Sequence, residues 1–155
     1  MFAGSSAWIT GASSGIGAAL ARELARQGAR LVLSGRNVAA LEALAQECGG
    51  ALVLPFETTD YAALPALVER AWDWSGGIDM LVNNAGISQR SLAVATEFPV
   101  YQRIVDVDLL APIALTQALL PQLVARGSGR IVMISSIAGK VGVPMRTAYC
   151  TAKFG

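Results

Sequence analysis

A tyrosine and a lysine lie four residues apart in the stretch AYCTAKFG (148–155). Residues four apart lie on the same face of a helix, so Lys153 would hold its ammonium group beside the phenol of Tyr149. A free tyrosine has a pKa of about 10, and a cation within about 4–6 Å favours the charged form of the phenol. The pair could therefore exchange a proton with a bound molecule, although this spacing alone is more typical of an ordinary helix.

The 155 residues include no histidine. This composition excludes Ser-His-Asp and Cys-His catalysis and histidine-ligated metals, and it leaves tyrosine as the best remaining proton carrier. The two cysteines, Cys48 and Cys150, are far apart and not in metal-ligand spacing. We therefore predict no metal site and a reduced, intracellular setting.

The composition indicates a globular chain, with 54% apolar residues, 15% charged residues and a formal net charge of +1. No basic run is present, so neither a nucleic-acid partner nor an anionic-membrane surface is expected. The N-terminus lacks a basic segment followed by an apolar one, which argues against a signal peptide. The apolar stretch 109–125 is interrupted by polar residues and two prolines. We predict a buried helix there rather than a membrane span, and a cytoplasmic protein.

Short β-like runs alternate with helix-like runs along the chain, and the β-like runs are apolar on both faces. This alternation predicts an α/β fold with a doubly wound, Rossmann-like parallel sheet. The predicted strands are 6–10, 30–34, 51–56, 78–83 and 130–135, and the predicted helices are 16–28, 38–49, 60–74, about 97–126 and one from near Thr147.

The last predicted strand, 130–135, would be an apolar sheet edge without a partner. The helix that follows it stops after roughly two turns. We therefore expect residues 1–155 to form a single dinucleotide-binding domain whose C-terminal part is missing, as in a piece of a longer polypeptide.

The turn TGASSGIG (10–17) joins the first strand to the first helix and carries Gly11, Gly15 and Gly17. Glycines allow a tight turn and a close approach of the backbone to a ligand, and the helix N-terminus beyond them offers N–H groups to a pyrophosphate. The first strand–helix junction is the usual place for such a turn. The alternative is a plain turn in which Ser13 or Ser14 caps the helix.

The second strand ends in LSGRN (33–37), which contains no acidic residue to bind a ribose 2′-hydroxyl group. Arg36 lies about where a 2′-phosphate would be, and a guanidinium group matches phosphate geometry. The sequence therefore favours NADP over NAD, the alternative being a solvated arginine before a helix.

Four motifs occur in order along the chain: TGASSGIG, NNAG (83–86), SS (135–136) and YCTAK (149–153). Together they resemble the short-chain dehydrogenase/reductase family, and the glycine spacing resembles its shorter oxidoreductase branch. The resemblance covers essentially the whole chain. It implies hydride transfer between a nicotinamide cofactor, NADP(H) by the Arg36 argument above, and a small-molecule carbonyl or alcohol. It also implies homo-dimers or homo-tetramers formed through the long helix and the Tyr–Lys helix. The alternative is a non-catalytic NADP-binding or interaction protein on the same fold.

The resemblance also implies a role for each matching residue. Tyr149 would be the proton donor, Lys153 the cation beside it, and Ser136, thirteen residues before Tyr149, the group that holds the substrate oxygen. The implied cofactor-binding residues are Gly11, Ser13, Ser14, Gly15, Ile16, Gly17, Arg36, Glu57, Asn83, Ala85, Gly86, Tyr149 and Lys153.

Asp108 stands where the family usually has an asparagine that kinks the long helix and leads a water to the lysine. Aspartate cannot donate a hydrogen bond unless it is protonated. An ionised Asp108 would draw the charge of Lys153 away from Tyr149, whereas an Asp108 protonated by burial would imitate asparagine. We expect a tolerated variant among the catalytic residues and an active enzyme.

Other positions near the expected site carry weaker signals. Glu57 stands where the family commonly has aspartate close to the adenine, and Asp60 is expected to cap the following helix. Arg90 and Arg146 flank the expected cleft and could meet an acidic substrate, but a solvated surface role is expected for both.

Overall fold

A five-stranded parallel sheet forms the centre of the computed structural model, which describes residues 2–155. The strand order is β3-β2-β1-β4-β5, as a doubly wound sheet requires. The predicted α/β, Rossmann-like fold is confirmed. The strands are β1 (Ser6–Thr10), β2 (Arg30–Ser34), β3 (Leu52–Val53), β4 (Met80–Asn83) and β5 (Arg130–Met133).

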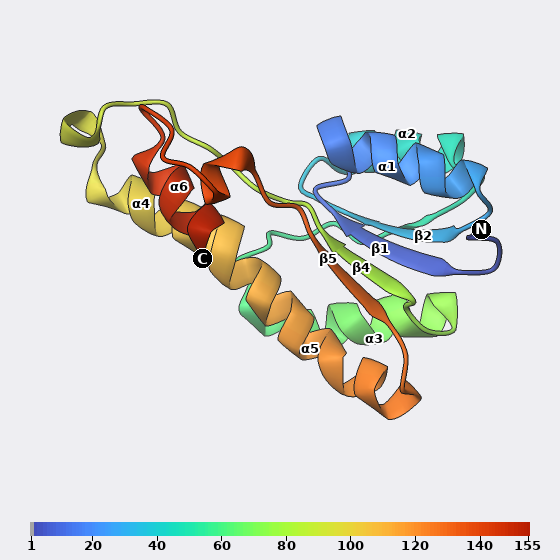
Figure 1. Ribbon diagram of the computed structural model, residues 1–155. Coiled ribbons are helices and arrows are strands. Elements are labelled where there is room, and N and C mark those ends of the chain that lie inside the picture. Colours follow the sequence, from blue (N-terminus) through green and yellow to red (C-terminus); the bar gives the residue numbers. More distant parts are fainter. Residues whose placement is uncertain (1) are drawn as a thin grey trace.

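Helices cover both faces of the sheet (Figure 1). On one face α1 (Gly15–Arg26) and α2 (Val38–Glu47) lie side by side, and on the other lie α3 (Leu64–Ser75) and α5 (Ala111–Arg126). Each face has its own cluster of buried apolar side chains. Helices on both faces of the sheet bury both faces of its strands. This explains why the strands are apolar on both faces in the sequence.

Successive side chains of β1 belong alternately to the two clusters, because successive side chains of a strand point to opposite faces. Ile9 lies in the cluster under α1 and α2, and Trp8 lies in the cluster under α3 and α5. Both side chains are fully buried, and burial of a large apolar side chain contributes about 1.5–3 kcal/mol. The indole nitrogen of Trp8 donates to Ser34 Oγ at 2.8 Å, so its polar atom is satisfied inside the core.

The predicted helix at about 97–126 is two α-helices joined by a π-helical turn. It consists of α4 (Phe98–Val105), the π turn Asp106–Leu110 and α5. The extra residue in the turn changes the direction in which side chains project, and such turns often occur at functional sites. Beside α4 lies α6 (Thr147–Phe154), shown in red in Figure 1, and the two share a third apolar cluster built on Ile104, Ala148 and Ala152.

Within residues 2–155, the continuous helix Phe98–Arg126 is long and apolar enough to cross a membrane, judged by length and composition alone. Its Leu115, Leu119 and Leu123 pack in the core cluster on the sheet, whereas Leu110, Leu120 and Val124 are exposed. The predicted buried helix is therefore buried on one face only. The cytoplasmic location stays a prediction.

The fifth strand is the outer edge of the described sheet and pairs only with β4 there. Its Ile131 and Met133 are 36% and 50% exposed, in contrast to the fully buried β1. The apolar edge predicted from the sequence is therefore present in the structure.

Candidate active site

The glycine-rich turn follows β1 and leads directly into α1. Gly11 has a φ of +65°, a left-handed conformation that a side chain would disfavour. At Gly17 a Cβ atom would lie 2.5 Å from the carbonyl oxygen of Gly11 and 2.6 Å from Asn84 Nδ2. Both positions therefore require glycine, one for its backbone angle and the other for the close packing of the turn.

Ser14 occupies the N-cap position of α1, but no side chain makes a capping hydrogen bond there. The alternative reading of the turn as a simple serine cap therefore lacks its defining contact. The turn lines a cavity of about 420 Å³ at this end of the sheet, together with the segment after β4 and residues that follow β2 and β3. Of the predicted cofactor-binding residues, Gly11, Ser13, Ser14, Gly15, Ile16, Arg36, Glu57, Ala85 and Gly86 line it.

The NNAG segment is held against the glycine-rich turn by the hydroxyl group of Thr10 and the side chain of Asn84. Thr10 Oγ1 accepts hydrogen bonds from the backbone N–H groups of Asn84 and Ala85, both at 3.0 Å. The side chain of Asn84 donates to the carbonyl oxygens of Thr10 and Gly11 at 3.0 and 3.2 Å. This network fixes one wall of the cavity.

The predicted cofactor residue Asn83 lies elsewhere. Its side-chain nitrogen donates to Thr116 Oγ1 of α5 at 3.1 Å, and Asn83 does not line the cavity, whereas Asn84 does. Sequence reasoning named the first asparagine and missed the second. Neighbouring side chains leave the backbone in different directions, so only one of the two asparagines can face the cavity. The spacing of the motif does not tell which one.

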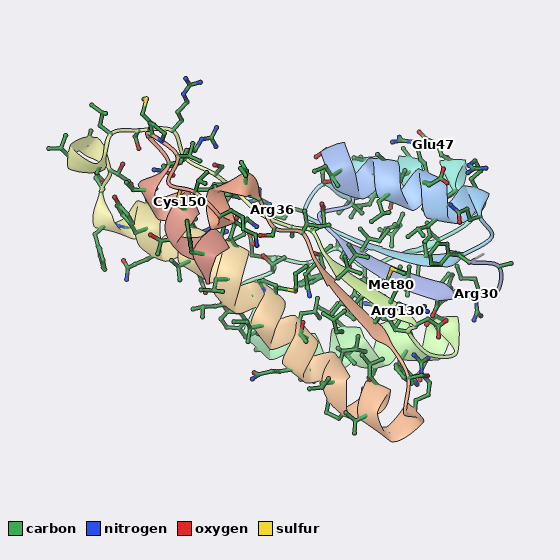
Figure 2. The ribbon with its side chains drawn as sticks, in the orientation of Figure 1. Arg30, Arg36, Glu47, Met80, Arg130 and Cys150 are labelled. Atoms are coloured by element: carbon green, nitrogen blue, oxygen red, sulfur yellow. The ribbon has the colours of Figure 1, made fainter. Side chains whose placement is uncertain are left out.

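An arginine that the sequence analysis did not select, Arg103, also lines the cavity. Arg103 of α4 makes an ion pair of 3.1 Å with Glu57 Oε2, and Arg36 approaches the same oxygen at 3.7 Å. Arg36 follows β2, at the end of the sheet opposite Arg30, as Figure 2 shows. Arg103 resembled a charged residue on a solvated helix face, so nothing in the sequence distinguished it.

Asp60 does not cap the following helix as predicted. The segment after it begins with a 3-10 turn, Tyr61–Ala63, and the Asp60 side chain makes no capping hydrogen bond. The α-helix begins only at Leu64, with Pro65 in its first turn supplying a residue that needs no N–H partner.

Tyr149 and Lys153 lie together on α6, as their spacing predicts. Lys153 Nζ is 5.6 Å from the centre of the Tyr149 ring and donates to the carbonyl oxygen of Ile134 at 3.2 Å. The backbone of α6 at Lys153 also touches Gly139, where a Cβ atom would collide with the Lys153 carbonyl oxygen. These contacts place the ammonium group between the end of β5 and the phenol.

Asp108 lies in the π turn, and its side chain is fully buried. Its Oδ1 accepts the backbone N–H of Ile87 at 2.7 Å, while its Oδ2 lies 3.4 Å from Lys153 Nζ. That second contact is an ion pair without hydrogen-bond alignment, since Oδ2 has no hydrogen-bond partner among the described residues. Burial raises the pKa of Asp108, and the Ile87 N–H and Lys153 lower it less. Asp108 therefore contacts the lysine, as the sequence analysis anticipated.

Ser136 lies just beyond β5 at the start of a 3-10 turn, Ile137–Gly139, where its hydroxyl oxygen accepts the N–H of Ala138 at 3.2 Å. Its hydroxyl hydrogen is free to donate to a further acceptor. The turn that carries Ser136 packs against α6, so the serine and the Tyr–Lys pair belong to one region.

The two flanking arginines differ in their surroundings. Arg146 donates to Ser88 Oγ, and its guanidinium carbon is 5.9 Å from the centre of the Tyr149 ring. Arg90 is exposed, as expected for a surface residue. Arg146 is half-buried. The solvated surface role expected for both arginines therefore describes Arg90 but not Arg146. Cys150, labelled in Figure 2, accepts the Val143 N–H through its sulfur at 3.4 Å.

No group of three or more His, Cys, Asp or Glu side chains that could hold a metal ion occurs within residues 2–155. The parallel sheet, the glycine-rich turn and the cavity beyond the carboxyl ends of β1, β2 and β4 define a Rossmann-like α/β fold.

The chain belongs to the short-chain dehydrogenase family, whose sequence profile, described as short chain dehydrogenase, matches residues 5–155. Human dehydrogenase/reductase SDR family member 7 is 40% identical over 154 residues, which cover 94% of this chain and 45% of that protein. Ketoacyl reductase HetN of Nostoc sp. is 40% identical over 159 residues, or 98% of this chain and 54% of that protein.

A solved structure of a proposed gluconate dehydrogenase from Agrobacterium tumefaciens has the same fold, with a TM-score of 0.93 and 30% sequence identity. The match covers 99% of this chain and 62% of that one. The chain thus spans about half the length of the curated relatives it matches.

Proposed function

We propose that the protein is an NADP-dependent oxidoreductase that transfers hydride between NADP(H) and a small-molecule carbonyl or alcohol. The observation that carries this proposal is the Tyr149–Lys153 pair, 5.6 Å apart from ring centre to ammonium, on the helix beside the turn of Ser136. The family consists of oxidoreductases that use NAD(P). Association into homo-dimers or homo-tetramers stays a prediction.

The residues that line the cavity suit a dinucleotide by their chemistry. The glycine-rich turn and the uncapped first turn of α1 would hold the pyrophosphate through N–H groups and the serine hydroxyls. Arg36 would hold the 2′-phosphate, and Ala85 and Gly86 would lie against the middle of the molecule. When bound, the nicotinamide supplies or accepts the hydride.

The chain's own residues handle the proton. Tyr149 gives its phenolic proton to the oxygen of the carbonyl as negative charge develops there, and in the reverse direction the phenolate accepts it. Lys153 holds its ammonium group 5.6 Å from the centre of the Tyr149 ring. The free O–H of Ser136 donates to the same substrate oxygen and holds it in place.

Asp108 is expected to weaken this arrangement without abolishing it. Replacement by asparagine should keep kcat within about ten-fold, because the amide oxygen can still accept the Ile87 N–H. The values of kcat for alcohol oxidation by the purified Asp108→Asn and parent proteins provide the measurement. A parent without turnover that Asp108→Asn restores would contradict a tolerated variant.

Arg36→Ala is expected to weaken NADPH binding by about ten- to a hundred-fold and NADH binding by less than about three-fold. The reason is that only NADPH carries the 2′-phosphate that a guanidinium group would bind. Titration of both cofactors into the protein measures the difference, with Arg30→Ala as the matched control because Arg30 is exposed at the opposite end of β2. Equal weakening of both cofactors would remove the phosphate assignment.

A second function is supported by one observation, the contact of Asp108 with Lys153. A carboxyl group 3.4 Å from the lysine, where the family usually has an asparagine, suits a non-catalytic NADP-binding protein on the same fold. The two functions are separated by following nicotinamide absorbance with a panel of ketones and aldehydes. Turnover of any of them supports the enzyme, and NADPH binding without turnover of any supports the binding protein.

A further inference from the structure

Two guanidinium groups from distant parts of the chain meet at one carboxylate oxygen beside the cavity. Arg36 Nη1 lies 3.7 Å and Arg103 Nη2 lies 3.1 Å from Glu57 Oε2. A second nitrogen of Arg103, Nη1, donates to Thr59 Oγ1 at 3.1 Å. All three charged residues line the cavity that the glycine-rich turn also lines.

This cluster holds two positive charges and one negative charge. The side chains of Arg36, Arg103 and Glu57 are 68%, 42% and 39% exposed, and ion pairs so open to water contribute little to stability. Their geometry can therefore change at small cost when a stronger anion arrives. A phosphate monoester carries about −1.5 to −2 charges at neutral pH and three acceptor oxygens, against one charge and two oxygens for the carboxylate.

We propose that Arg103 is the second cation of the 2′-phosphate subsite, and that Glu57 occupies this subsite until the phosphate displaces it. This inference rests on the proposed NADP function. The phosphate would bridge Arg36 and Arg103, each of which can bind two phosphate oxygens side by side. Glu57 then acts as a specificity residue, because its carboxylate repels the phosphate and must leave the two arginines for the phosphate to bind.

A purely structural role for Arg103 predicts a different outcome. Arg103 also ties α4 to the segment after β3 through Glu57 and Thr59. Loss of that tie would loosen the wall of the cavity and weaken every nucleotide alike. A phosphate subsite would affect only nucleotides that carry the 2′-phosphate, so the ratio of two affinities separates the roles.

The experiment is calorimetric titration of 2′,5′-ADP and 5′-AMP into the purified protein and its variants. Arg103→Gln should weaken 2′,5′-ADP by about ten-fold and leave 5′-AMP within about two-fold. Glu57→Gln should strengthen 2′,5′-ADP by about three-fold or more, because the competing charge is gone. Arg70→Gln, an exposed arginine on α3, changes the net charge equally and should leave both affinities unchanged.

Three results would overturn the inference, and they are distinguishable from one another. If Arg103→Gln weakens both nucleotides equally, Arg103 is a structural tie. If Glu57→Gln weakens both equally, Glu57 binds the adenine or ribose instead of competing with the phosphate. If the parent protein itself binds 5′-AMP as tightly as 2′,5′-ADP, the NADP preference of the proposed function fails, and the subsite fails with it.

Discussion

Gly17→Ala is expected to abolish NADPH binding, with a loss of affinity on the order of a hundred-fold or more. The added Cβ atom would lie 2.5 Å from the Gly11 carbonyl oxygen and 2.6 Å from Asn84 Nδ2. The first of these is backbone, so relief requires α1 to move away from the glycine-rich turn. That movement would also break the network in which Asn84 donates to Thr10 and Gly11, and overpacking of this kind costs about 1–3 kcal/mol of stability.

Fluorescence titration with NADPH measures the affinity of Gly17→Ala, and urea unfolding measures its stability. Gly142→Ala is the matched control, since a Cβ atom there has no neighbour within 4 Å and no positive φ to strain. Unchanged NADPH affinity in a folded Gly17→Ala protein would show that the dinucleotide does not bind at this turn.

Tyr149→Phe is expected to lower kcat/KM for carbonyl reduction by about 10²- to 10⁴-fold, the usual range for loss of a proton-transfer group. NADPH affinity should change little, because the substitution removes one oxygen atom and leaves the ring beside Lys153 and Arg146. A fall in kcat with retained cofactor binding separates a role in the chemical step from a role in folding.

Tyr101→Phe provides the control for removal of a hydrogen-bonded phenol in the same region. Tyr101 packs in the cluster shared by α4 and α6, and its hydroxyl group is 2.8 Å from Thr147 Oγ1. Its loss should reduce stability by about 1 kcal/mol and leave kcat within about three-fold. Turnover by Tyr149→Phe at the parent rate would exclude Tyr149 as the proton donor.

The sheet and the strand–helix turn were predictable because their signals are local. Apolar strands between amphipathic helices allow few topologies, and the tight turn at Gly11 requires glycine whatever the rest of the fold does. The pairing of Tyr149 with Lys153 was predictable for the same reason, since one helical turn separates them. Each of these features is decided by residues close together in the sequence.

The parts that the sequence did not predict depend on contacts between distant residues. Arg103 contacts Glu57 because the fold brings α4 beside the segment that follows β3. In the sequence alone, Arg103 looks like any charged residue on an exposed helix face. The surroundings of Asp108 depend on Ile87 and Lys153, which lie far from it in the sequence. Which asparagine of NNAG faces the cavity depends on the direction of the backbone after β4. The residue types in the motif do not predict that direction.

The contact between Gly139 and the Lys153 carbonyl oxygen has a consequence for the precision of the site. Here main chain meets main chain, without an intervening side chain whose rotamers could vary. The shortest spacing between the serine-bearing turn and α6 is therefore set by backbone atoms. A side chain at position 139 would push apart the two segments that carry the Ser136 and Tyr149 donors.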